Sequence, residues 1–265
     1  MIRRRRFYLI VHHYVGRQSF NRDGAFGIVP FFFERLLFSL GRVYFVSNRG
    51  VKNRISAMNP KARIELTQNG FDSSLLSLEP ALSHPPFILF MGRFDIYMKG
   101  LDILIPAYAE AAAAKGIDLV LAGRASVEDA ESVLALIPKH ISLRVRLESN
   151  ISDSRKAELL ASCLFFCSPS RFEGFGIAAL EANAAGKAAL VTDADGFCDS
   201  LSLGETALAV SPNDLEGLKS AMARLIENSE LRQLLGRRGR EHARAFSWDA
   251  IAEKEWGWIQ QAFLP

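Results

Sequence analysis

From residue 87 onward, short apolar runs alternate with segments long enough to form helices, and this alternation limits the possible folds. The runs at 87–92, 117–123, 163–170 and 187–193 have the length and composition of buried strands. Some of the segments between them begin with a Ser that can cap a helix. Strands separated by single helices predict βαβ units and a parallel sheet. Because ligands of such sheets bind at the carboxyl ends of the strands, we expect the functional residues in the loops that follow them.

Residues 1–72 contain fewer elements of the same kind. We expect a strand at 6–13, an apolar helix at 27–41 and two more strands at 42–47 and 62–66. These elements are too few for a complete α/β domain, which usually has about 100 residues or more. After a Ser- and Pro-rich linker near 72–86, the pattern continues to a last helix. The sequence therefore predicts an α/β protein with an incomplete first lobe, a complete second lobe and a closing helix, at 1–72, 73–246 and 247–265.

Composition excludes several classes of protein. The 265 residues are 49% apolar and 23% charged, with a net charge of +3, which is typical of a soluble protein and too small to indicate nucleic-acid binding. No apolar run approaches the ~20 residues of a membrane span. Three cysteines without a CxxC pattern favour the reducing cytoplasm. The basic run Arg3–Arg6 is either a solvated terminus or a peripheral contact with anionic lipid at the inner face of a membrane.

The stretch EGFGIAALE, from Glu173 to Glu181, follows a predicted strand and opens a predicted helix. Backbone N–H groups at a helix start favour phosphate, and Gly174 and Gly176 lack the Cβ atoms that would keep a ligand away from them. The two carboxylates are about 12 Å apart along a helix of ~1.5 Å rise per residue, which suits a diphosphate between a hexose and a ribose. Alternatively, Glu173 caps the helix and Glu181 is a solvated helix residue.

The loop after the first predicted strand of this half carries two cations, Arg93 and Lys99, in the sequence FMGRFDIYMKG. Arg as a planar fork and Lys as a point charge can together neutralise a diphosphate. They can also stabilise the charge that develops on a departing nucleoside diphosphate. The alternative is a pair of solvated surface cations.

Three weaker signals are also present. GFGIAA at 174–179, with Asp193 near the end of the next strand, is a variant dinucleotide fingerprint, but several βα units precede it, which argues against a dehydrogenase. Asp193 and Asp195 form a D-x-D pattern, which is either a metal site or a turn. His12 and His13 end the first predicted strand, and because adjacent strand residues face opposite ways, only one is expected to reach a substrate.

Taken together, these motifs resemble the carboxyl-terminal half of family 4 retaining glycosyltransferases, which have the GT-B fold of two Rossmann-like lobes. VHHYVGRQSF at 11–20 is similar to the family's histidine loop in the amino-terminal lobe, with His12 in the matching place. Three positions depart from the family pattern: 145–150 lacks a usual glycine, Asp199 replaces Glu and Ala207 replaces Gly. The matching pieces, in the family's order, are VSNRG (46–50), QNGFD (68–72), MGRFDIYMKGLDILIPA (91–107), LVLAG (119–123), the segment 151–193 and FSWDAIA (246–252).

The resemblance implies transfer of a hexose from a UDP- or GDP-sugar to a saccharide acceptor, with retention of the anomeric configuration and without a metal or other cofactor. In the resemblance, His12 contacts the donor sugar or the acceptor, and Arg93 and Lys99 bind the diphosphate. Glu173 contacts the transferred sugar, and Glu181 binds the ribose. Contacts with sugar or phosphate come from the backbone of Gly174, Phe175, Gly176 and Ile177.

Two other interpretations stay open. Because most of an amino-terminal lobe is missing, the chain could be the donor-binding half of a split or truncated enzyme, inactive without a partner chain that supplies that lobe. Alternatively, the same fold could carry a nucleotide-sugar epimerase or a phosphorylase. An uncovered apolar helix at 30–40 would favour a partner.

Overall fold

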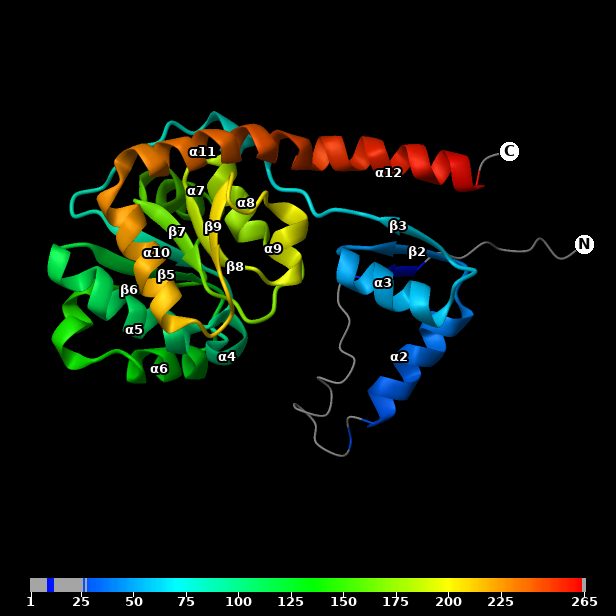
Figure 1. Ribbon diagram of the computed structural model, residues 1–265, viewed down its shortest axis with the longest axis horizontal. Helices are drawn as coiled ribbons and strands as arrows, with labels where there is room; N and C mark the ends of the chain where they lie inside the picture. Colours follow the sequence, from blue (N-terminus) through cyan, green and yellow to red (C-terminus); the bar gives the residue numbers. More distant parts are fainter. Residues whose placement is uncertain (1–8, 12–25, 27, 264–265) are drawn as a thin grey trace, which may run out of the picture. The chain divides into compact units, whose positions relative to one another are not determined.

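The computed structural model describes residues 9–11, 26 and 28–263 (Figure 1). The chain divides into two compact units. The first unit comprises Met1–Asn69 and Asp249–Pro265, and the second unit is Gly70–Trp248. Arg3–Arg6 and His12 lie outside the described residues, so their predicted roles stay predictions. Among the described residues, no helix is both long and apolar enough to cross a membrane.

The second unit is built on a six-stranded parallel sheet in the order β6-β5-β4-β7-β8-β9. The chain runs outward from β4 to β6 and then returns to form β7 beside β4, so the direction of winding reverses between β4 and β7. In open α/β sheets, this switch point is where ligands bind. The strands are β4 (Phe87–Met91), β5 (Asp118–Gly123), β6 (Val145–Ser149), β7 (Phe165–Ser168), β8 (Ala189–Thr192) and β9 (Ala207–Val210).

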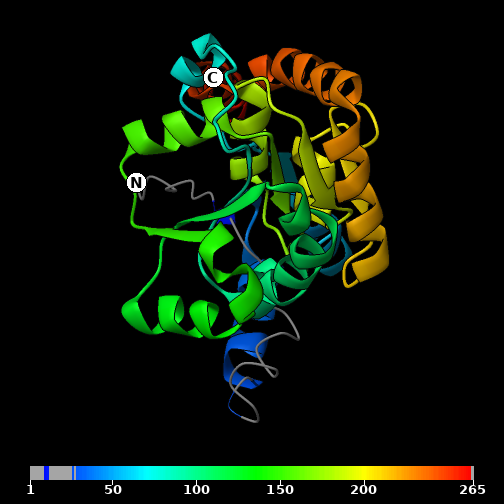
Figure 2. The same ribbon diagram turned by 90° about the vertical axis from the view of Figure 1, so that its left-hand side faces the viewer.

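Helices cover both faces of this sheet (Figure 2). Alternate strand residues enter two separate cores: Ile88 and Phe90 join the core beside α5 and α10, whereas Leu89 joins the core beside α7, α8 and α11. The helices are α4 (Ile96–Lys99), α5 (Leu101–Ala111), α6 (Val127–Ala135), α7 (Asp153–Ser162), α8 (Ile177–Ala184), α9 (Asp195–Ser200), α10 (Leu215–Glu227) and α11 (Ser229–Ala243).

The strands predicted at 87–92, 117–123, 163–170 and 187–193 are confirmed as β4, β5, β7 and β8, and two other expectations are corrected. The turn expected at Asp195 is the start of α9. The expected linker at 72–86 belongs to the second unit, because its Ala81 and Ser83 amides donate to carbonyl groups at the end of α7.

The first unit has a three-stranded parallel sheet in the order β1-β2-β3. Its core is small and includes Tyr44, Val46, Val51 and Ile55. The apolar helix α2 exposes most of its large side chains, among them Phe32 at 60%. The elements are β1 (Leu9–Val11), α2 (Ile28–Leu40), β2 (Val43–Val46), α3 (Arg49–Met58), β3 (Arg63–Leu66) and α12 (Trp248–Phe263), which begins at the last residue of the second unit.

Candidate functional site

Two predicted site residues meet at the switch point of the large sheet. Lys99 ends α4, which follows β4, and Glu173 lies in the loop that follows β7. The Lys99 Nζ donates to Glu173 Oε2 at 2.8 Å, and the side chains are 17% and 16% exposed. The other carboxylate oxygen of Glu173 accepts the Gly174 amide at 3.2 Å. The structure therefore places a partly buried cation and anion together after the carboxyl ends of β4 and β7, where parallel sheets bind ligands.

Glu173 does not cap the following helix, so this alternative interpretation is wrong. The N-cap of α8 is Gly176, and no side chain bonds to this helix start. Gly176 has φ of 85°, and an added Cβ would lie 2.5 Å from the Phe197 ring. The turn and its packing therefore require glycine at this position. They explain Gly176 without the room for a ligand that was expected from the sequence. The neighbouring Phe175 is buried and packs against the Phe246 ring at 6.0 Å, which holds the helix start in place.

Glu181, the last residue of the motif, lines a pocket of 530 Å³, here called the Glu181 pocket. Its Oε1 accepts from Lys156 Nζ at 2.9 Å, and the residue is 8% exposed, so it is not a solvated helix residue. Burial raises the pKa of Glu181 above its ordinary value even though Lys156 opposes the shift. Burial lowers the pKa of Lys156, but Glu181 and Asp153 outweigh it and leave that pKa raised. The other lining residues are Gly70, Phe71, Asp72, Ser74, Leu75, Asp153, Ser154, Ala157, Ile177 and Trp248.

Arg93 lines a second pocket, of 540 Å³, here called the Arg93 pocket. It lies past the carboxyl ends of β4, β5 and β6, as the strand pattern predicted for a ligand site. Arg124 also lines it, and the sequence analysis missed this residue, although it follows a predicted strand just as Arg93 does. Ser126 and Asp129 form a capping box at the start of α6 and complete one wall.

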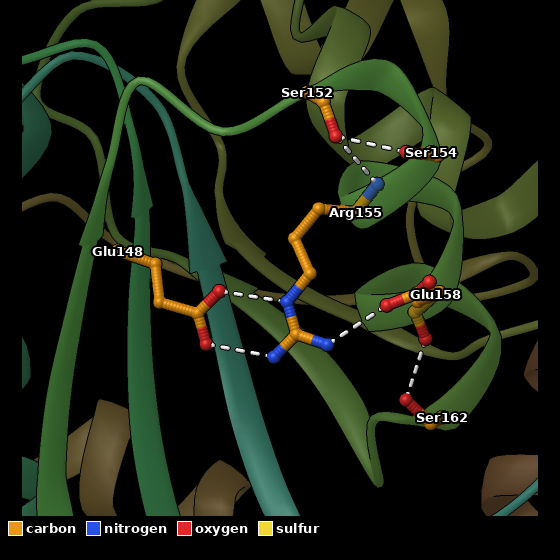
Figure 3. A network of polar contacts seen from close by, with 6 residues as sticks. All are labelled: Glu148, Ser152, Ser154, Arg155, Glu158 and Ser162. Atoms are coloured by element: carbon orange, nitrogen blue, oxygen red, sulfur yellow. Dashed lines mark hydrogen bonds and ion pairs between the residues drawn. The ribbon is translucent and has the colours of Figure 1, made fainter.

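The loop between β6 and α7 contributes Asn150 to the Arg93 pocket and leads into α7, whose first turns line the Glu181 pocket, and a polar network joins β6 to α7 across it (Figure 3). Arg155 of α7 holds both carboxylate oxygens of Glu148, at the end of β6, with contacts of 2.8 and 2.9 Å, and also binds Glu158 at 2.9 Å. The Ser152 hydroxyl caps α7 and accepts the Arg155 amide at 3.2 Å. The hydrogen bond from Arg155 lowers the pKa of Glu148. A bidentate charge-assisted pair fixes geometry as well as adding energy, so this network holds the loop between the pockets in one conformation.

The structure thus joins Lys99 to Glu173 directly and places Ile177 and Glu181 in one pocket, with Arg93 in the other. Within the described part of the chain, no group of three or more His, Cys, Asp or Glu side chains could hold a metal ion. The D-x-D pattern at Asp193 and Asp195 is therefore not part of such a cluster.

The family model of the glycosyl transferases group 1 matches residues 79–242, which include the predicted donor-site residues from Arg93 to Glu181. The chain belongs to this family. A phosphatidyl-myo-inositol mannosyltransferase of Mycobacterium leprae is 30% identical over 192 residues, which are 70% of this chain and 50% of that protein. An uncharacterized glycosyltransferase of Methanocaldococcus jannaschii is 30% identical over 219 residues, 83% of this chain and 59% of that protein. The chain spans half or a little more of these glycosyltransferases.

Solved structures show the same fold. Sucrose-phosphate synthase from Thermosynechococcus elongatus matches with a TM-score of 0.82 and 22% identity, over 97% of this chain and 67% of that one. Anabaena HepE, in a complex with UDP-glucose, matches with a TM-score of 0.78 and 17% identity, over 97% and 73% of the two chains. The fold is therefore the α/β GT-B fold of glycosyltransferases, and the six-stranded sheet is one Rossmann-like lobe of it.

Proposed function

We propose that the second unit binds a nucleotide-sugar donor, and that the protein to which it belongs is a retaining glycosyltransferase of family 4 that transfers a hexose to a saccharide acceptor. The observation that supports this most is the Lys99–Glu173 pair, held at 2.8 Å at the switch point of the sheet. A cation beside an anion at that position can bind a diphosphate through one group and sugar hydroxyls through the other. The complex of HepE with UDP-glucose supports the donor class, since it has the same fold.

In the proposed reaction, the bond between the sugar C1 and the diphosphate oxygen breaks, and a bond from C1 to the acceptor oxygen forms on the same face. The acceptor proton passes to the departing phosphate oxygen. Arg93 and Lys99 stabilise the negative charge that grows on the diphosphate, which is the largest single contribution such a site can make. Glu173 binds the transferred hexose and Glu181 accepts hydrogen bonds from the ribose. No metal is required, because the two cations supply the positive charge.

Calorimetric titration with UDP, GDP and their hexose conjugates tests the donor site. We expect one of the two nucleotides to bind, and Arg93→Ala and Glu181→Ala each to weaken its binding by about 1–3 kcal/mol. Glu230→Ala, which removes an exposed carboxylate at the start of α11, is the matched control and should leave affinity unchanged. Unchanged nucleotide affinity in a folded Glu181→Ala variant would contradict the proposed contact between Glu181 and the ribose.

A second candidate is a donor-binding half that transfers sugar only when another chain completes the first lobe. The exposed apolar residues of α2, including Phe32, Phe33 and Leu36, favour this candidate, because no layer covers them among the residues that the structure describes. Release of free hexose or transfer by the isolated chain would argue against it, whereas donor binding without turnover would support it. Analysis of the products from a nucleotide-sugar would separate transfer from epimerisation or phosphorolysis.

A further inference from the structure

The side chain of Arg171, two residues before Glu173, contacts Asp102, Tyr97 and Asn213. Its side chain is only 8% exposed. The two terminal nitrogens hold the two carboxylate oxygens of Asp102 at 2.7 and 2.8 Å, and one of them also donates to the Tyr97 carbonyl at 2.7 Å. The guanidinium lies 4.5 Å from the centroid of the Tyr97 ring, and its Nε donates to the Asn213 side chain.

These contacts join the two segments that carry the candidate donor-binding pair. Tyr97 and Asp102 flank Lys99, the last residue of α4, whereas Arg171 belongs to the loop that leads to Glu173. The Arg171 side chain and the Lys99–Glu173 contact therefore both join the segments that follow β4 and β7, the strands on either side of the switch point.

The backbones of the same two segments lie against each other. The Arg171 amide donates to the Met98 carbonyl at 2.9 Å. Gly100 has φ of 67°, and a Cβ added there would lie 2.2 Å from the Pro169 carbonyl oxygen. Because the segments already touch at this point, the fork of Arg171 acts as a clamp that fixes their relative position. A bidentate, partly desolvated guanidinium–carboxylate pair is suited to this, since it is both strong and directional.

We propose that Arg171 is a positioning residue for the donor site: through its clamp on Asp102 and Tyr97 it sets the position of Lys99 relative to Glu173. The inference rests on the proposed function, because the position matters only if a donor binds there. Arg171 itself does not hold the diphosphate and acts through Lys99. Reacting groups must be held within about 0.5 Å of their productive geometry, and a misplacement of about 1 Å can cost 10²-fold in rate.

A double-mutant cycle between positions 171 and 99 tests this role. We expect Arg171→Met to weaken binding of the nucleotide, UDP or GDP, about 10-fold and to lower donor turnover at saturation about 10- to 100-fold. Added to Lys99→Met, Arg171→Met should cause little further loss, because its effect passes through Lys99. Arg171→Lys keeps the charge but loses the fork, so it should recover only part of the affinity. Arg144→Met, which breaks an ion pair with Asp118 in the same unit, is the matched control and should change neither quantity.

The outcomes separate the inference from the function on which it rests. Suppose that the unaltered chain binds nucleotide and that Lys99→Met weakens this binding. If the loss from Arg171→Met then adds in full to the loss from Lys99→Met, the positioning role of Arg171 is overturned and the donor site stands. If the unaltered chain binds neither UDP nor GDP, the proposed function fails, and the inference fails with it. Should Arg171→Met not fold, Asp102→Asn removes the charge of the other partner and must show the same coupling to Lys99.

Discussion

The two units of the chain use the same kind of sheet but cover it to different extents. In the second unit, buried side chains form a core on each face of the six-stranded sheet. In the part of the first unit that the structure describes, one small core lies against the three-stranded sheet, and α2 exposes Ile28, Phe32, Phe33 and Leu36. A parallel sheet is normally covered on both faces, so the second unit is complete by this measure and the described part of the first unit is not.

The difference concerns function as well as packing. All predicted donor-site residues that the structure describes lie in the second unit, from Arg93 to Glu181. His12, the predicted contact of the other lobe, lies outside the described residues. Under the proposed function, nucleotide binding therefore belongs to the unit that has a core on each face of its sheet.

The two units should respond differently to the loss of one phenylalanine side chain. Phe90 is fully buried in the second unit, so Phe90→Ala should lower the free energy of unfolding by about 3–5 kcal/mol. Phe32 is 60% exposed, so Phe32→Ala should change it by no more than about 0.5 kcal/mol. Urea unfolding followed by circular dichroism measures both. An equal cost for the two variants would mean that α2 is covered in solution, and the comparison between the units would fail.

The next effect concerns turnover. Lys99→Ala removes the cation at the switch point, and by analogy with loss of one charge-stabilising donor it should slow donor turnover about 10²–10³-fold. Lys61→Ala, an exposed lysine of the first unit, should leave nucleotide affinity and turnover unchanged. Stopped or continuous assays of nucleoside diphosphate release provide the measurement. A comparable loss from Lys61→Ala would show that donor binding is not confined to the second unit.

Much of the fold could be predicted because buried strands are short and uniformly apolar. The runs that became β4, β5, β7 and β8 were found for this reason. The helix α3 was missed because its sequence, RGVKNRISAM, is mostly polar and buries only Val51 and Ile55. Strand β9, of sequence ALAV, was missed because two of its four residues are Ala, which has low strand propensity.

Several residues of the candidate site could be selected from the sequence, but their contacts with one another could not. Position after a strand was enough to select Arg93, Lys99 and Glu173. The partners could not be inferred, because Lys99 and Glu173 are 74 residues apart in the sequence and meet only through the order of strands in the sheet. Lys156 was missed for a related reason, since its contact with Glu181 depends on how α7 and α8 pack on one face.

The pH dependence of stability and of nucleotide affinity tests the Glu181 pocket. Lys156→Met removes the group that lowers the pKa of Glu181, so burial should raise that pKa further. A buried acid with a raised pKa binds a proton more tightly in the folded state, so stability falls as pH rises from about 4.3, the ordinary carboxyl value, through the raised one. At neutral pH the variant should lose about 1–3 kcal/mol of stability, and its nucleotide affinity should increase as pH rises through the Glu181 pKa.

Two further variants control this experiment. Lys156→Arg keeps the positive charge and should retain most of the stability at neutral pH. Adding Glu181→Gln to Lys156→Met removes the titrating group and should flatten the pH profile. A profile that stays steep without Glu181 would assign the titration to another group of the pocket, such as Asp153 or Asp72.

The smallest effect compares the same chemistry in the two units. Asn48 caps α3 of the first unit by accepting the Val51 amide at 2.8 Å, and Ser152 caps α7 of the second by accepting the Arg155 amide at 3.2 Å. Loss of either cap to Ala should cost about 1 kcal/mol. If the units are separate cooperative bodies, each variant should speed amide hydrogen exchange only within its own unit. If Asn48→Ala also speeds exchange in the strands of the large sheet, the two units open together, and the stability of the second unit depends on the first.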